Sequence, residues 1–403
     1  MKRVLVIASE CLLGNTKAFQ VRRLLRFASA SGLALTCALA SADDWEPTGA
    51  PSSVWMKLAS SADGVKLAAA GISPWAIQTS TNSGVTWTQT PAPYEKWYSI
   101  ASSADGLKLV ALSDCDTCSQ PTGGSATSTN GGATWRVSSE PAVWWLDVAS
   151  SADGGLLVAA GKPSIYTSTN FGESWNLTTA PTNAWNSVAC SADGTKLVAA
   201  GGWVYTSTNS GVTWTVANGI VASRVASSAD GNKLAAIGWD GSIYTSSDAG
   251  TTWKANTIAN VNFWNSIGSS ADGTVLIAST DYGPVYVSTD SGTNWVLSLA
   301  LTRNWGPVAS SADGSKLFAC VENNGGIYRW QAVPVLSIGV EDGVSVLSWP
   351  ATSSAADFTL EQTSQLDSVG WNAVTNSPIP LKQSMKVNIS PTNGQSFFRM
   401  SRF

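Results

Sequence analysis

The chain has 403 residues, of which only 12% are charged, and its formal net charge is −4. Because it has no basic surplus to neutralise phosphates, we do not expect nucleic acid as a partner. Histidine does not occur in the sequence, which excludes Ser-His-Asp and Cys-His catalysis and any metal site with an imidazole ligand.

Residues 1–42 have the pattern of an export signal. Four basic residues precede an apolar run of small residues: Lys17, Arg22, Arg23 and Arg26. The run, SGLALTCALASA, ends at Ala42 in an A-x-A site, and this order predicts a secretory signal peptide cleaved near that residue. A membrane anchor is the alternative, but the run is short for a span. We expect a protein of the periplasm, cell envelope or extracellular space, with no membrane span after cleavage.

Two short motifs alternate through residues 43–332. The tetrapeptide SADG occurs seven times, with its aspartates at positions 63, 105, 153, 193, 230, 272 and 313. An eight-residue motif, STNSGVTW or a variant of it, occurs six times: at Ser80–Trp87, Ser128–Trp135, Ser168–Trp175, Ser207–Trp214, Ser246–Trp253 and Ser288–Trp295. The aspartates are 37 to 48 residues apart, which is the length of one β-propeller blade.

The repeat Trp185–Ala217 divides into four short strands. The Asp193-Gly194 turn separates the first two, because Asp bonds its own backbone and Gly accepts a positive φ. No segment has a helical period, and a β-solenoid would have shorter coils. The sequence therefore predicts an all-β fold, a seven-bladed β-propeller over residues 43–332.

The ends of the repeat region predict how the ring closes. The stretch DWEPTGAP at residues 44–51 resembles TWTQTPAP at residues 86–93, which contains a fourth strand. Ile327–Trp330 forms a third strand that no repeat motif follows. We expect the N-terminal strand to complete the last blade, which removes open sheet edges.

The eight-residue motif follows the pattern S-x-D-x-G-x-T-W and resembles the Asp-box, or BNR repeat, of the sialidase, xyloglucanase and sortilin-like propellers. The resemblance implies a turn between the third and fourth strands of a blade, on the face opposite the active site, with the Trp packed into the blade. The capping position is held by Asn82, Asn130, Asn170, Asn209, Asp248 and Asp290. An Asx turn needs only an acceptor oxygen, whereas a catalytic acid or a calcium site needs the charge. We therefore interpret all six as structural.

The loops on the other face hold residues that the repeat does not require. The binding candidates are aromatic: Trp75, Trp203, Trp239 and Tyr282. The candidate catalytic residues are carboxylates, two of which would suffice for glycoside hydrolysis at the right separation: Asp147, Asp240, Asp281 and Glu322. A solvated polar rim is the alternative interpretation of the loop carboxylates.

A second set of tryptophans is regular. Each lies eight residues before an SADG aspartate, with Ala222 as the exception: Trp55, Trp97, Trp145, Trp185, Trp264 and Trp305. A ring of tryptophans could stack on sugars, but a position that recurs in each repeat favours packing between blades.

The cysteines that follow the predicted signal peptide indicate one disulfide. Cys115 and Cys118 lie in the loop SDCDTCSQ and are candidates for a disulfide in an oxidising compartment. A metal or redox role is the alternative, but no second pair and no histidine supports it. Cys190 and Cys320 fall in strand patterns and are interpreted as buried thiols. We expect no metal and no cofactor.

Residues 333–403 lack the repeat. The stretches VSVLSWP, FTLEQTS and KVNIS alternate like short strands, and they predict a C-terminal β-sandwich that resembles immunoglobulin or fibronectin type III modules.

The function we expect is that of a secreted, monomeric, non-catalytic propeller. It would recognise a glycan or an extracellular protein on the loop face opposite the Asp-boxes. A glycoside hydrolase that uses two carboxylates of the same face is the alternative. Sialidase activity is not expected, because the F/Y-R-I-P motif of that family is missing from the sequence.

Overall fold

In the computed structural model, the described residues form strands and turns and no helix. They are residues 4–6, 45–72, 75–93, 95–113, 123–138, 141, 143–256, 258, 261, 263–281, 283–323, 325–331, 337–341, 344–350, 358–363, 372–374, 379–381, 384–389 and 396–402. The chain divides into two compact units. One spans Asp43–Gln331, and the other combines Met1–Ala42 with Ala332–Phe403.

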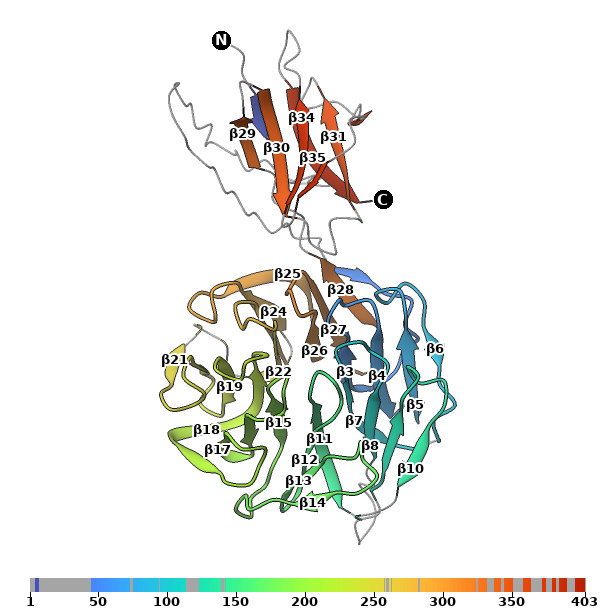
Figure 1. The fold of residues 1–403 in the computed structure, drawn as a ribbon, viewed down its shortest axis with the longest axis vertical. Coiled ribbons are helices and arrows are strands. Elements are labelled where there is room, and N and C mark those ends of the chain that lie inside the picture. The colour runs from blue at the N-terminus through green and yellow to red at the C-terminus, as the bar shows by residue number, and fades with distance from the viewer. Residues whose placement is uncertain are drawn as a thin grey trace. The chain divides into compact units, whose positions relative to one another are not determined.

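The described strands of Asp43–Gln331 form six antiparallel sheets arranged around a centre (Figure 1). The first three sheets follow chain order. Sheet one contains β3 (Trp55–Ser60), β4 (Leu67–Ile72), β5 (Trp75–Ser80) and β6 (Thr88–Gln89). Sheet two contains β7 (Trp97–Ser102), β8 (Leu109–Ser113), β9 (Ser125–Ser128) and β10 (Arg136–Ser138). Sheet three contains β11 (Trp144–Ser150), β12 (Leu157–Lys162), β13 (Ile165–Ser168) and β14 (Asn176–Leu177).

The fourth sheet has seven strands, because the long strand β18 (Thr215–Ser227) is shared by two repeats. The first repeat contributes β15 (Ser187–Cys190), β16 (Leu197–Ala200) and β17 (Gly202–Ser207). The second contributes β19 (Leu234–Gly238), β20 (Ile243–Ser246) and β21 (Lys254–Asn256).

The last two sheets bring the ends of the unit together. One contains β22 (Trp264–Ser269), β23 (Leu276–Thr280), β24 (Gly283–Ser288) and β25 (Val296–Arg303). The other contains β26 (Trp305–Ser310), β27 (Lys316–Val321), β28 (Ile327–Gln331) and the early strand β2 (Trp45–Pro47). In this sheet Trp45 pairs with Trp330, and the Thr48 N–H donates to the Ile327 carbonyl over 2.8 Å.

The innermost strands form a closed circle. The strands β3, β7, β11, β15, β18, β22 and β26 each contact the next, and β26 contacts β3. The alanine of each SADG motif donates its N–H to the alanine carbonyl of the next motif, at 2.7 to 2.8 Å, and Ala312 closes the circle by donating to Ala62. We call this set of backbone bonds the alanine ring.

Each SADG turn is held by its own serine and aspartate. In the copy at Ser191, the Ser191 hydroxyl donates to Asp193 Oδ1 over 2.6 Å, and the Thr195 N–H donates to the same oxygen over 2.9 Å. The Lys196 N–H donates to Ser191 Oγ over 3.0 Å. Gly194 has a φ of 72°, a conformation that favours glycine.

Neighbouring turns interlock through these glycines. A Cβ on Gly106 would lie 2.8 Å from Lys66 Cβ, so the lysine stem of one repeat packs on the turn glycine of the next. The Lys66 ammonium then donates to the Asp105 carbonyl over 2.7 Å.

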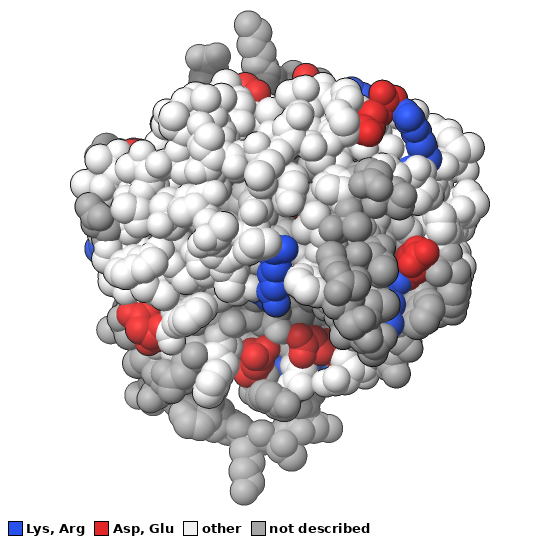
Figure 2. Space-filling view, turned by 90° about the horizontal axis from the view of Figure 1, so that it is seen from below, with Lys and Arg blue, Asp and Glu red and all other residues white. Residues whose placement is uncertain are grey.

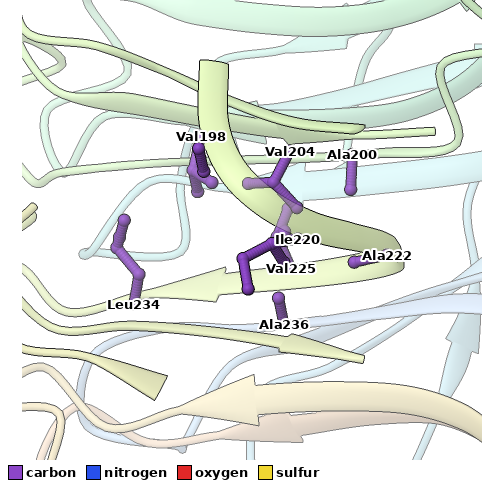
Figure 3. Packing of buried hydrophobic residues seen from close by; sticks show 9 residues of the cluster. Val198, Ala200, Val204, Ile220, Ala222, Val225, Leu234 and Ala236 are labelled. Carbon is purple, nitrogen blue, oxygen red and sulfur yellow. The ribbon is translucent and has the colours of Figure 1, made fainter. Parts of the chain in front are cut away.

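The core lies between the strands of adjacent repeats. Figure 3 shows one cluster in which side chains of β16, β17, β18 and β19 point toward one another: Val198, Ala200, Val204, Ile220, Ala222, Val225, Leu234 and Ala236. The six regular tryptophans are at most 8% exposed. Their burial agrees with packing as their role.

The second unit contains two four-stranded sheets. One contains β29 (Ser337–Glu341), β30 (Val344–Pro350), β34 (Ser384–Ile389) and β33 (Ile379–Leu381). The other contains β1 (Val4–Val6), parallel to β35 (Ser396–Arg402), with β31 (Phe358–Thr363) and β32 (Asn372–Ala373). Val346, Leu347, Leu360 and Val387 are buried. The fibronectin-like sandwich stays a prediction.

Candidate binding face

Two kinds of turn lie at the same end of the sheets of Asp43–Gln331. Backbone bonds join the eight-residue turn of a repeat to its SADG turn: the Ser83 N–H donates to the Val65 carbonyl and the Ser210 N–H to the Thr195 carbonyl, both over 2.8 Å. The opposite end carries the loops between second and third strands and the connections between repeats. We call that end the loop face.

The eight-residue turns use their polar side chains internally. Asn209 Oδ1 accepts the Ser207 hydroxyl over 3.0 Å and the Thr213 N–H over 2.8 Å, and its Nδ2 donates to Thr213 Oγ1 over 2.9 Å. Equivalent bonds hold the other five capping residues: Asn82, Asn130, Asn170, Asp248 and Asp290. Asn and Asp make the same turn, so the carboxylate charge is not needed for it.

Asp147 lies at the inner strands, buried to 3% exposure. Its Oδ1 accepts the Lys57 ammonium over 2.7 Å and the Ser99 hydroxyl over 2.9 Å. Its Oδ2 accepts the Ser187 hydroxyl over 3.0 Å and the Val188 N–H over 3.1 Å. Burial alone would raise the pKa of Asp147, but the Lys57 charge and these hydrogen bonds hold that pKa below its usual range. The carboxylate therefore couples β3, β7, β11 and β15.

Two of the predicted carboxylates converge on the loop face. Asn265 Nδ2 donates to Asp281 Oδ1 and to Glu322 Oε1, over 2.7 Å each. Both oxygens are bonded to one nitrogen, so they are no farther apart than twice that distance. Burial raises the pKa of Glu322, and the Asp281 charge adds to this, while the Asn265 bond opposes it. We call Asp281 and Glu322 the acidic pair.

Asp240 makes local bonds. Its Oδ2 accepts the Tyr244 hydroxyl over 2.7 Å, and its Oδ1 accepts the Ser242 N–H over 3.0 Å. Burial would raise its pKa, but these bonds lower it. Asp240 therefore stabilises the loop between β19 and β20.

Exposed aromatic side chains gather on the same face. Trp203 is 50% exposed, Trp239 is 63% exposed and Phe263 is 70% exposed. Trp203 pairs with Val221 across β17 and β18, and the Trp239 N–H donates to the Val221 carbonyl over 3.4 Å. We call Trp203, Val221 and Trp239 the tryptophan row.

Phe263 connects the row to the acidic pair. Its carbonyl accepts the Asp281 N–H over 2.9 Å. The next residue, Trp264, donates from Nε1 to the Gly241 carbonyl over 2.9 Å. The loop that begins with Trp239 is thus bonded to the strand start that carries Phe263 and Asn265.

Solved structures resemble the chain in fold, although no family model and no curated protein matches its sequence. A structure titled "YCF48 bound to D1 peptide" has a TM-score of 0.56 and 13% identity, over 72% of this chain and 95% of that one. YCF48 from Cyanidioschyzon merolae has a TM-score of 0.55 and 14% identity, over 72% and 98%. The Cps50 (Swd1) β-propeller domain of Myceliophteria thermophila has a TM-score of 0.58 and 15% identity, over 71% and 99%.

The chain contains a β-propeller. The all-β prediction is thereby confirmed, and at these identities the likeness concerns the fold alone. The antiparallel sheets of Asp43–Gln331 form the propeller.

Four predicted site residues lie wholly or in part outside the described residues. Trp75 begins β5, whereas Tyr282, Cys115 and Cys118 lie outside the described residues. Cys190 and Cys320 are free thiols, and burial raises the pKa of both.

Asn265, Phe263 and Val221 are site residues that the sequence pattern does not predict. Asn265 and Phe263 flank the regular tryptophan Trp264, and neither of them belongs to a sequence motif. The shortened step of 37 residues between Asp193 and Asp230, together with Ala222, marked the region of Val221.

Other features of the described surface are less specific. Two grooves lie between neighbouring eight-residue turns, one of about 340 Å³ beside Trp253 and one of about 250 Å³ beside Trp135. Charged side chains on the side seen in Figure 2 are single or in small groups.

Among the described residues, no three His, Cys, Asp or Glu side chains are placed to hold a metal ion. No helix in the described part of the chain is long and apolar enough to cross a membrane.

Proposed function

We propose that the protein is an exported, non-catalytic binding propeller that recognises a glycan or a protein on its loop face. The observation that carries the proposal is the exposure of Trp203, Trp239 and Phe263 on that one face. Large aromatic side chains at the surface are typical of binding sites. The polar atoms of the opposite face are used within its turns.

The architecture we propose has seven blades, with β2 as the closing strand. Seven inner strands in a circle and the alanine ring support that blade number. The Arg329–Glu46 ion pair at 3.3 Å and the Trp45–Trp305 ring contact at 5.8 Å support closure by β2. The motif pattern supports membership of the Asp-box family, and the basic and apolar segments before Ala42 support export.

A protein partner has support from a similar fold. The YCF48 structure is titled as bound to a D1 peptide, so this fold can present a peptide-binding surface. A glycan has support from the tryptophans. Both classes therefore belong in the first experiment.

The test is a glycan and peptide array probed with the full chain and two triple variants. In the first, W203A/W239A/F263A, we expect binding to fall at least tenfold, which is about 1.4 kcal/mol. The control, V85A/L107A/V212A, removes exposed apolar side chains from the Asp-box end and is expected to bind like the parent. Equal binding by all three proteins would contradict the proposal.

A glycoside hydrolase is the second candidate, because the acidic pair converges and the pKa of Glu322 is raised. A glycoside hydrolase uses two nearby carboxyl groups, one of which is protonated. The same array eluates are analysed for newly formed reducing ends. Release of sugars that stops in Glu322→Gln would favour the enzyme over the binding protein.

A further inference from the structure

The tryptophan row lies where two blades merge into one sheet. Ala222 pairs with Gly202 on one side and with Gly238 on the other. Val221 pairs with Trp203 on one side, and on the other its carbonyl accepts the N–H of Trp239, the residue that follows β19. Two cross-strand rows therefore run side by side over β17, β18 and β19. Cross-strand partners share a face of a sheet, and successive residues alternate between faces.

The two rows are opposites in size and burial. The row Gly202–Ala222–Gly238 contains only small residues, and Ala222 is 0% exposed. On Gly238 a Cβ would lie 2.4 Å from Asp240 Oδ1 and 2.6 Å from Tyr244 Cε2. The loss of the regular tryptophan at position 222 lets the strands close up on the buried face. The exposed face then presents two indole side chains on either side of Val221.

The spacing of the two tryptophans is fixed by the sheet. Adjacent strands lie about 4.8 Å apart, so the Trp203 and Trp239 backbones are separated by two strand spacings, about 10 Å. This is close to the length of two sugar units in an extended glycan. Pyranose rings present C–H faces that stack on indole rings.

The row offers side-chain faces rather than backbone groups. Ala222 of β18 is paired on both sides, and Val221 is bonded to Trp203 on one side and to Trp239 on the other. A peptide therefore cannot add here as a further strand, the usual way in which an extended peptide gains main-chain bonds. Of the residues that precede or follow row members in sequence, only Asp240 is charged, and Tyr244 and Ser242 occupy its carboxylate. An uncharged ligand that binds by ring stacking fits these features better than a peptide.

We propose that the tryptophan row is a stacking platform for an extended, uncharged glycan, with Trp203 and Trp239 each holding one sugar ring of the same chain. This inference rests on the proposed binding function and names its ligand class. A ligand that spans both tryptophans needs at least three sugar units.

The test measures binding of the full chain to β-1,4-linked glucan, xylan and N-acetylglucosamine oligosaccharides by titration calorimetry. We expect a hexasaccharide of one series to bind at least tenfold more tightly than its disaccharide, since only the longer ligand reaches both rings. Trp203→Ala and Trp239→Ala should each weaken hexasaccharide binding about tenfold and abolish the preference for length. Val212→Ala is the control, an exposed apolar side chain of the opposite end of the sheets, and should change the affinity less than twofold.

The outcomes separate this inference from the function on which it rests. Equal affinity for disaccharide and hexasaccharide, or equal losses in Val212→Ala and the row variants, would overturn the platform. No glycan binding together with peptide binding on the array would overturn it and leave the binding function intact. No binding of either class would overturn both. Thermal unfolding of each variant verifies that the exposed substitutions leave the fold intact.

Discussion

Asp147 shows how much a single side chain can hold together in this fold. It was a candidate for catalysis from the sequence, yet its two oxygens accept bonds from Lys57, Ser99, Ser187 and Val188. These partners lie on three other inner strands. Because Asp147 binds residues of these strands, we interpret its role as structural. Its removal should weaken the contacts among four of the inner strands.

We expect Asp147→Asn to lower the free energy of unfolding by about 2 to 4 kcal/mol, because it removes the charge that Lys57 faces and replaces one acceptor by a donor. The measurement is urea unfolding at pH 7. Glu173→Gln is the matched control, since Glu173 forms an exposed ion pair with Arg136, and such pairs contribute about 1 kcal/mol or less. Similar losses in the two variants would show that Asp147 has no special structural role.

The eight-residue turns allow a test of whether the capping residue needs only an acceptor oxygen or also a charge. Asn82→Asp should change the free energy of unfolding by less than about 0.5 kcal/mol, because Asp248 caps the equivalent turn of another repeat with a carboxylate. Asn82→Ala should cost about 1 to 2 kcal/mol, because the Thr86 N–H and the Ser80 hydroxyl lose their acceptor. Thermal unfolding of the two variants decides between them. A larger loss for Asp than for Ala would mean that the charge matters.

At the scale of elements, the regular strands were predictable and the merged strand was not. Four short strands per repeat follow from alternating residues between Gly and Asp turns, which are local signals. The continuity of β18 depends on a connection that is shorter than its counterparts, and on the pairing of Ala222 with both β17 and β19. Ala222 stood out in the sequence, but nothing local indicated what its small size would expose on the other face.

The acidic pair was predictable only in part. Asp281 and Glu322 follow the second strands of neighbouring repeats, so their proximity was expected from the architecture. Their bridge is Asn265, at a position where one other repeat also has asparagine, Asn186, and the remaining repeats have other residues. Side-chain bridges of this kind depend on three-dimensional packing, and the sequence pattern of one repeat does not contain them.

Restoring the regular tryptophan at position 222 should therefore destabilise the protein. We expect Ala222→Trp to lower the free energy of unfolding by about 3 kcal/mol or more, because the site is fully buried between Gly202 and Gly238 and has no room for an indole. The reverse substitution, Trp185→Ala, should also cost about 3 to 5 kcal/mol, because it leaves a cavity. Urea unfolding of both variants measures this; a stabilising Ala222→Trp would contradict the packing described for β18.

At the scale of the whole molecule, the two ends of the propeller differ in regularity. The alanine ring is complete at the end that carries the SADG turns. Farther along the inner strands, the hydroxyls of Ser99, Ser187 and Ser266 accept N–H groups of the next strand. Lys57, Arg224 and Pro307 replace serine or aspartate at the equivalent positions. The repeat is thus preserved where it closes the ring and varies toward the loop face, where the proposed binding residues lie.

The seven SADG aspartates should make the stability of the propeller sensitive to acid. Their pKa values all lie below the usual range: Asp63, Asp105, Asp153, Asp193, Asp230, Asp272 and Asp313. For Asp193 and Asp230 the hydrogen bond from the turn serine is the largest cause, and it lowers the pKa to about 2. At Asp63, Asp272 and Asp313 burial opposes the shift and is outweighed. A lowered folded pKa stabilises the protein at pH values above the unfolded pKa, about 3.9.

The melting temperature should consequently be nearly constant from pH 8 to about pH 5 and fall steeply between about pH 4 and pH 2. Glu322 acts in the opposite direction, because its raised pKa favours the folded state at low pH, but it is one group against seven. The double variant D193N/D230N keeps acceptor oxygens in two turns and removes their titration, so its melting temperature should fall less between pH 4 and pH 2. Differential scanning calorimetry of parent and variant compares the two slopes. Identical slopes would place the acid sensitivity outside the SADG turns, whereas a shallower slope would tie it to the turns whose alanines close the ring.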